Sequence, residues 1–131
     1  MIVSDTNVLA YLLLPYEFSP QADALFSRDP DWAVPILWRS EFRNLLAGYL
    51  RRKTLTFDEV LKVQAEAEAL VAGNEHEVDS RRVLELVRDS ACSAYDCEFV
   101  ALAAQLGTKV VTMDAKLLKA FPHHALALSS A

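Results

Sequence analysis

Residues 93–120 read SAYDCEFVALAAQLGTKVVTMDAKLLKA, and this stretch gives the clearest indication of fold class. Apolar side chains in its first half recur at the i, i+3, i+4 and i+7 positions of a helix, namely at Phe99, Leu102, Ala103 and Leu106. Gly107 is a typical helix terminator, and residues 109–113 after it (Lys-Val-Val-Thr-Met) predict a buried strand. Asp114 then begins a short helix, which we expect to span residues 115–120. Helix, strand and helix in such close succession are typical of an α/β protein.

The same alternation extends towards the N-terminus. We expect further strands at residues 2–5, 32–34, 77–79 and 125–128, the last at a sheet edge, and further helices at residues 8–14, 20–27, 36–50, about 57–71 and 81–88. Short turns between alternating strands and helices favour a parallel sheet covered on both faces. The 131 residues contain no internal repeat or linker, so we expect a single domain.

Composition and charge limit the possible classes of protein. With 53% hydrophobic and 24% charged residues the chain has the composition of a compact globular protein. No apolar run reaches the roughly 18 residues of a membrane span, and no signal peptide is recognisable, so we expect a soluble, cytoplasmic protein. Cys92 and Cys97 fit neither a metal site nor a secreted disulfide framework, and we expect both to be reduced and packed.

The formal net charge of −5 argues against a broad positive field for nucleic acid. It does not exclude a nuclease, because a metal site built of carboxylates adds negative charge to the sum.

Four acidic residues are candidates for a functional site. Asp5 and Asp114 each follow a predicted strand, and ligands of open α/β sheets bind beyond the carboxyl ends of the strands. Either residue could instead simply cap the helix that follows it. Asp96 lies three residues after Ser93, which resembles a capping box. Glu41 lies at the margin of an apolar helix face and has no Lys or Arg at i+3 or i+4 to pair with it.

The α/β arrangement can bring all four acids to one end of the sheet. Two like charges about 4 Å apart repel by roughly 4 kcal/mol at an effective dielectric constant near 20, so such a group needs compensation. Mg²⁺ or Mn²⁺, which prefer oxygen ligands, would provide it. Zinc is disfavoured, because His76, His123 and His124 are expected in loops, exposed to solvent and without ligand spacing. Hydroxyl and amide groups of Thr6, Asn7, Ser93 and Thr112 could orient the carboxylates, or bond only to their local backbone.

Four segments, in this order, resemble the PIN-domain nucleases, and in particular the VapC-type toxins of prokaryotic toxin–antitoxin pairs. These segments are Asp5-Thr6-Asn7-Val8-Leu9, Glu41 within an early helix, Ser93 to Ala103, and Val110 to Leu118. The resemblance covers nearly the whole chain. It implies a Rossmann-like, three-layer α/β/α PIN domain over residues 1–131 with a central parallel sheet.

The resemblance also implies a metal-dependent ribonuclease that cleaves single-stranded RNA. Carried over by position, Asp5, Glu41, Asp96 and Asp114 would hold Mg²⁺ or Mn²⁺ or activate water, with Asn7 and Thr112 supporting them. The extra acid Glu98 could join the site or face solvent. Homodimers are implied as well, together with a cognate antitoxin whose C-terminal segment occupies the active-site groove.

Such a site would hydrolyse the phosphodiester with water activated at the cation and without a covalent enzyme intermediate. Candidates for phosphate contacts along the groove are Arg39, Arg43, Arg51, Arg52, Lys53, Lys116 and Lys119.

A different class of function also fits the sequence. A non-catalytic PIN-like module could bind protein or RNA, with the amphipathic segments 20–27 and 57–71 as a partner-binding face. Two other families fit less well: an aspartyl phosphatase would need a second acid where Asn7 stands, and a phospho-accepting receiver would need an acidic pair at the first strand. The chain lacks the glycine-rich motifs of nucleotide cofactor sites.

Overall fold

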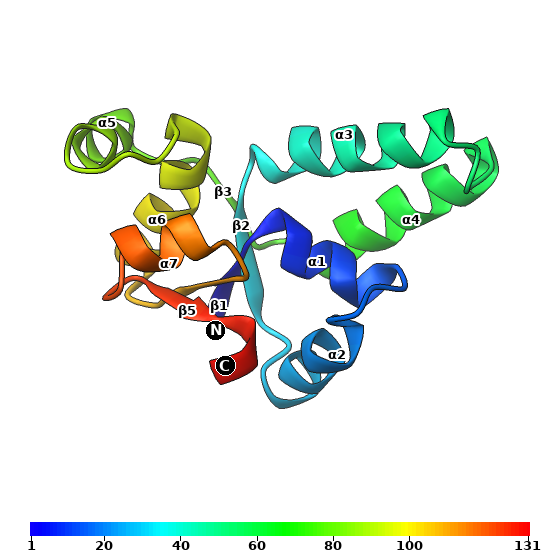
Figure 1. Ribbon diagram of the computed structural model, residues 1–131, viewed down its shortest axis with the longest axis horizontal. Coiled ribbons are helices and arrows are strands. Elements are labelled where there is room, and N and C mark those ends of the chain that lie inside the picture. Colours follow the sequence, from blue (N-terminus) through cyan, green and yellow to red (C-terminus); the bar gives the residue numbers. More distant parts are fainter.

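The computed structural model describes all residues 1–131 and shows an α/β fold around a five-stranded sheet (Figure 1). The strands are β1 (Ile2–Ser4), β2 (Trp32–Pro35), β3 (Glu75–His76), β4 (Val110–Thr112) and β5 (Ala125–Ala127). They lie in the order β3-β2-β1-β4-β5, and every neighbouring pair is parallel. The predicted α/β class with a central parallel sheet is confirmed, as is the edge position of the last strand.

Seven α-helices cover the two faces of this sheet. They are α1 (Thr6–Leu13), α2 (Ser19–Arg28), α3 (Trp38–Arg51), α4 (Phe57–Leu70), α5 (Ser80–Arg88), α6 (Ala94–Leu106) and α7 (Ala115–Ala120), with a 3₁₀ turn at Leu128–Ser130. Helices α1 to α4 lie on one side and α5 to α7 on the other, which gives three layers (Figure 1). None of these helices is both long enough and apolar enough to cross a bilayer.

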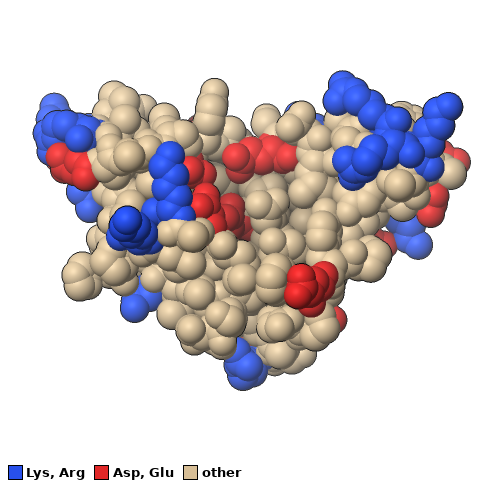
Figure 2. Space-filling model, viewed as in Figure 1, with Lys and Arg blue, Asp and Glu red and all other residues tan.

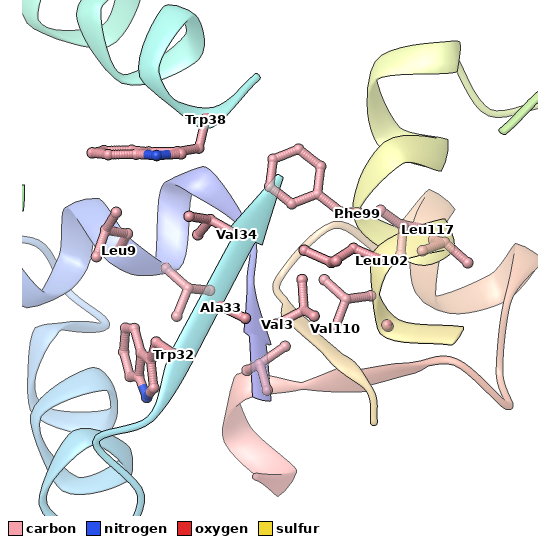
Figure 3. Close-up of a cluster of buried hydrophobic side chains, with 14 of the residues drawn as sticks. Val3, Leu9, Trp32, Ala33, Val34, Trp38, Phe99, Leu102, Val110 and Leu117 are labelled. Atoms are coloured by element: carbon pink, nitrogen blue, oxygen red, sulfur yellow. The ribbon is translucent and has the colours of Figure 1, made fainter. Parts of the chain in front are cut away.

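Apolar side chains from both helical layers meet on the sheet. Leu9 and Trp38 pack on one side of the strands, whereas Phe99 and Leu102 pack on the other (Figure 3). Because both faces are covered, the central strands are buried on both sides and read as apolar runs rather than as an alternating pattern.

Both cysteines belong to this core. Cys92 and Cys97 are buried and form no disulfide, as expected for reduced thiols that pack.

The strand predicted at residues 77–79 is wrong. β3 lies just before it, and the carbonyls of Asn74 and His76 accept hydrogen bonds from the amides of Val34 and Ile36. Asp79 instead caps α5, and its carboxylate accepts a hydrogen bond from the Arg82 amide at 3.3 Å. His76 is therefore a half-buried strand residue and not the solvent-exposed loop residue that we expected. The other predicted elements are present, with ends that differ by two residues or fewer.

Arg39, predicted as a phosphate contact, has a structural role. Its guanidinium contacts both carboxylate oxygens of Glu75, at 2.6 and 2.8 Å, and reaches Glu68 at 2.8 Å. The Trp38 indole N–H donates to the same Glu75 at 2.6 Å. These contacts tie α3 and α4 to the edge strand β3 and leave Arg39 engaged within the fold.

The pairing of β1 with β4 determines where the functional candidates emerge. Ser4 pairs with Val111, and the Asp5 amide donates to the Val111 carbonyl at 3.1 Å. Because the two strands are parallel, Asp5 follows β1 and Asp114 follows β4 at the same end of the sheet, the carboxyl end of the strands.

We expect Gly107→Ala to lower the free energy of unfolding by about 1 kcal/mol. Gly107 ends α6 with a φ of +67°, a conformation that costs energy for any residue with a Cβ, although no atom lies within 4 Å of the added methyl group. The measurement is urea denaturation followed by circular dichroism.

Gly48→Ala is the matched control, because Gly48 lies inside α3. Its added Cβ would meet only the flexible end of Arg52, at 3.0 Å, so helix propensity should make this change neutral or stabilising. Equal stability of the Gly107→Ala variant and the native protein would contradict the conformational argument.

Candidate active site

A polar cavity of about 280 Å³ opens at the carboxyl end of the sheet. Its walls are formed by Asp5, Thr6, Asn7, Glu41, Asn44, Leu45, Asp96 and Asp114. All four acids selected from the sequence therefore line one cavity, although they come from four separate segments. Figure 2 shows acidic side chains gathered in a hollow on this face of the molecule.

Asp5 is held from two directions. Its Oδ1 accepts the Thr6 amide at 2.8 Å, which caps α1, and its Oδ2 accepts the Thr112 hydroxyl at 2.6 Å. The Thr112 hydroxyl in turn accepts the Asp114 amide at 3.0 Å. Asp5 is thus both a helix cap and a cavity residue, so the two interpretations of the sequence are compatible. Thr112 links the ends of β1 and β4.

Glu41 enters the cavity from the first turn of α3. Its Oε1 accepts the Thr6 hydroxyl at 2.8 Å, and no basic side chain pairs with it. The sequence analysis missed Asn44, which also lines the cavity. Because residues three apart share a helix face, its position relative to Glu41 could have indicated it.

Asp96 and Asp114 complete the wall formed by α6 and α7. Ser93 caps α6 by accepting the Asp96 amide at 3.1 Å, so the structure places its hydroxyl at the helix end and not among the lining residues of the cavity. Asp114 caps α7 through Oδ1, which accepts the Lys116 amide at 2.9 Å. Neither carboxylate forms an ion pair.

The acids disfavour each other's ionisation. Burial raises the pKa of Asp5, and the charges of Asp96 and Asp114 raise it further, against the lowering effect of the Thr112 hydrogen bond. The pKa of Glu41 is raised by burial and then by Asp5 and Asp96. Burial and the charge of Asp114 raise the pKa of Asp96, against the lowering effects of the Ser93 hydrogen bond and the Lys116 charge. The cavity is therefore a region of excess negative charge without an ion-pair partner.

Glu98 is a fifth acid close to this group. Burial raises its pKa, and its charge contributes to the raised pKa of Glu41. It does not line the acidic cavity but a separate hollow beside α5.

The donor set has the chemistry of a site for a hard divalent cation. Carboxylate oxygens with hydroxyl and amide neighbours suit Mg²⁺ or Mn²⁺, and no His or Cys lines the cavity to favour zinc. As the side chains lie, no three of them have the spacing of a formed metal site.

A sequence profile described as the PIN domain matches residues 2–122 of the chain. The chain belongs to the PIN-domain family. This VapC-like PIN domain is 30% identical to "Ribonuclease VapC3" of Pyrobaculum aerophilum over 134 residues, which cover 92% of this chain and 95% of the relative.

Solved structures share the PIN fold over nearly the whole chain. PAE2754 from Pyrobaculum aerophilum superimposes with a TM-score of 0.77 at 18% identity and covers 98% of this chain and 83% of its own. A toxin–antitoxin complex from Klebsiella pneumoniae matches with a TM-score of 0.68 at 18% identity and covers all of both chains.

Glu41→Gln should raise the melting temperature of the PIN domain in the presence of a chelator. The amide oxygen of Gln can still accept the Thr6 hydroxyl, while the charge that repels Asp5 and Asp96 is lost. Two charges about 8 Å apart repel by roughly 2 kcal/mol at a dielectric constant near 20. Solvent screening reduces the expected increase in the free energy of unfolding to about 1 kcal/mol, which corresponds to a melting temperature higher by roughly 4 °C. Differential scanning calorimetry measures it.

The matched control is Glu66→Gln, because Glu66 is an exposed residue of α4 without an ion pair. We expect no more than a marginal shift for this control. A melting temperature lowered by Glu41→Gln would mean that the carboxylate stabilises the fold.

Without divalent ions, the free energy of unfolding should rise as the pH falls from neutral into the mildly acidic range. The folded protein binds protons on Asp5 and Glu41 more tightly than the unfolded chain, because both pKa values are raised from 3.8 and 4.5. The destabilisation caused by the two charged carboxylates is therefore present at neutral pH. It disappears below the pKa values that these groups have in the unfolded chain. Below about pH 4 stability falls again, because Asp29 and Glu75 have lowered pKa values.

Urea denaturation at a series of pH values with a chelator tests this profile. In the Glu41→Gln variant, the increase in the free energy of unfolding as the pH falls should be smaller. A monotonic loss of stability from pH 7 downwards would refute the electrostatic picture of the cavity.

Proposed function

We propose that this PIN domain is a metal-dependent endoribonuclease that cleaves single-stranded RNA and acts in the cytoplasm as the toxin of a toxin–antitoxin pair. The observation that carries the proposal is the cavity at the carboxyl end of the sheet, where four carboxylates meet without a basic partner. A structural role would favour compensation by Lys or Arg, as Glu75 receives from Arg39. The similarity to a ribonuclease named VapC3 supports the nuclease assignment.

Asp5, Glu41, Asp96 and Asp114 would hold Mg²⁺ or Mn²⁺. When bound, the cation would lower the pKa of water and neutralise charge that develops on the phosphate. Oxygen atoms of these residues remain available for this role, because Thr6 uses only one oxygen of Glu41 and Lys116 only one of Asp114.

The two threonines position the acids. Thr112 donates to Asp5, and Thr6 donates to Glu41, so each hydroxyl fixes a carboxylate rotamer and favours its charged form. Because Thr112 also accepts the Asp114 amide, one hydroxyl group links the positions of Asp5 and Asp114. Asn7 and Asn44 add amide groups to the cavity wall and are available to substrate. Ser93 would support Asp96 indirectly by capping its helix.

We further propose a cognate antitoxin as inhibitor and a homodimeric assembly. The antitoxin is supported by the shared fold with the Klebsiella pneumoniae complex, whose name describes a toxin and its antitoxin. The homodimer rests on the resemblance to VapC-type toxins alone.

Asp5→Asn should reduce Mg²⁺-dependent cleavage of single-stranded RNA on the order of a hundredfold or more. The amide oxygen can still cap α1, so the fold should persist, whereas the charge that would bind the cation is lost. Cleavage of a fluorescently labelled oligoribonucleotide, with circular dichroism of each protein, provides the measurement.

Asp23→Asn is the matched control, because Asp23 is exposed on α2 and its carboxylate has no ion pair. This variant should cleave as the native protein does. Undiminished cleavage by Asp5→Asn would refute the assignment of the site. Absence of Mg²⁺ and Mn²⁺ binding in calorimetry would favour a non-catalytic PIN-like binding module.

A further inference from the structure

A second cavity, of about 440 Å³, lies between the end of α5 and α7. Its walls are formed by Asp89, Ser90, Ala91, Cys92, Lys116, Lys119 and Ala120. We refer to it as the lysine pocket. Neither the acids nor the threonines of the candidate active site contribute to it.

The lysine pocket adjoins the acidic cavity. Asp114 lines the first cavity and Lys116, two residues later, lines the second, with 2.9 Å between the Lys116 amide and the Asp114 carboxylate. On the opposite wall, Cys92 is near enough to the acids that its pKa, raised mainly by burial, is raised further by Asp96 and Asp114. Figure 2 shows basic side chains over α7 beside the acidic hollow.

The pocket presents two lysines that form no ion pair within the protein. Lys116 and Lys119 are three residues apart on α7, which places them on one helix face, and both are exposed without an ion pair. Asp89 is the acid of the pocket wall, and Arg88 already binds both of its carboxylate oxygens, at 2.8 and 3.0 Å. The charge of Lys116 acts at a distance on Asp96, but neither ammonium group forms an ion pair, so both are available to an anionic ligand.

Lysine pairs beside an acidic cavity are useful to a substrate that is itself a polyanion. The chain carries a net charge of −5, so an RNA strand approaching the acids needs local cations to offset repulsion. The basic residues at the end of α3 are more remote, because Arg51 lies ten residues beyond Glu41, about 15 Å along the helix axis. Lys116 is two residues from Asp114.

We propose that the lysine pocket is a subsite that binds a backbone phosphate of single-stranded RNA next to the phosphodiester in the acidic cavity. Lys116 and Lys119 act as positioning residues, which hold the strand so that the neighbouring linkage lies at the acids. The subsite rests on the proposed ribonuclease function and specifies how that function engages its substrate.

Binding and cleavage are measured separately. Affinity for a labelled single-stranded oligoribonucleotide is measured by fluorescence anisotropy over a series of salt concentrations, in an Asp5→Asn background that suppresses cleavage. Lys119→Gln and the double variant with Lys116→Gln should bind more weakly. The slope of log K against log salt should become shallower by about 0.7 for each lysine removed.

Cleavage kinetics separate positioning from chemistry. In the otherwise native protein, Lys119→Gln should raise KM several-fold and change kcat less than twofold, and Lys119→Arg should restore most of the affinity. Lys109→Gln is the matched control, because Lys109 is exposed and precedes β4, at the end of the sheet opposite to the acids. It removes the same charge and should leave the RNA affinity, salt slope and KM nearly unchanged.

The outcomes distinguish the subsite from the ribonuclease function. RNA affinity and salt slope that are unchanged in the double variant would overturn the subsite, whether or not the native protein cleaves RNA. A loss of RNA affinity in Lys109→Gln as large as that in Lys119→Gln would also overturn the subsite, because it would show a general effect of net charge. Lysine-dependent RNA binding by a native protein that does not cleave would support the subsite and contradict the nuclease proposal.

Discussion

The pairing of β1 with β4 brings Asp5 and Asp114 to the same end of the sheet. The repulsion between their carboxylates is the constraint around which the site is arranged. The hydroxyl of Thr112 lies between them, donating to the Asp5 carboxylate and accepting the Asp114 amide. Helices α3 and α6 then add Glu41 and Asp96 to the same cavity. Each added carboxylate increases the electrostatic repulsion within the cavity. A bound cation would reduce this repulsion, while the rest of the fold is well packed.

Two glutamates of this chain show how the same residue type can serve opposite purposes. Glu75 contacts the Arg39 guanidinium through both oxygens, and its pKa is lowered. Glu41 has a hydroxyl partner but no cation, and its pKa is raised by burial and by neighbouring acids. The first arrangement stabilises the fold by fastening the edge strand. The second leaves charge uncompensated, as expected where a bound ion is to supply the compensation.

Acidic and basic side chains occupy different regions of the protein surface, which the net charge alone does not show. Acidic side chains occupy the hollow of the face in Figure 2, with basic side chains over α7 on one side of it and over the joined ends of α3 and α4 on the other. If the protein binds RNA and cations as proposed, the strand would be attracted on both sides of a centre that repels it in the absence of the cations. A bulk charge of −5 is compatible with this arrangement, because interactions with a polyanion depend on local charge within about a Debye length.

The sequence by itself determined the fold class, the approximate bounds of most helices and strands, and the identity of the four acids. Helix periodicity, capping residues and strand-to-helix turns depend on interactions between residues a few positions apart, so local patterns encode them. Only the tertiary structure decided the position of β3, the structural role of Arg39, the inclusion of Asn44 and the existence of the lysine pocket. These features depend on contacts between residues far apart in the chain, such as those of Arg39 with Glu68 and Glu75, which lie 29 and 36 residues away. Local spacing carries no information about such contacts, because packing of the helices on the sheet determines which distant side chains meet.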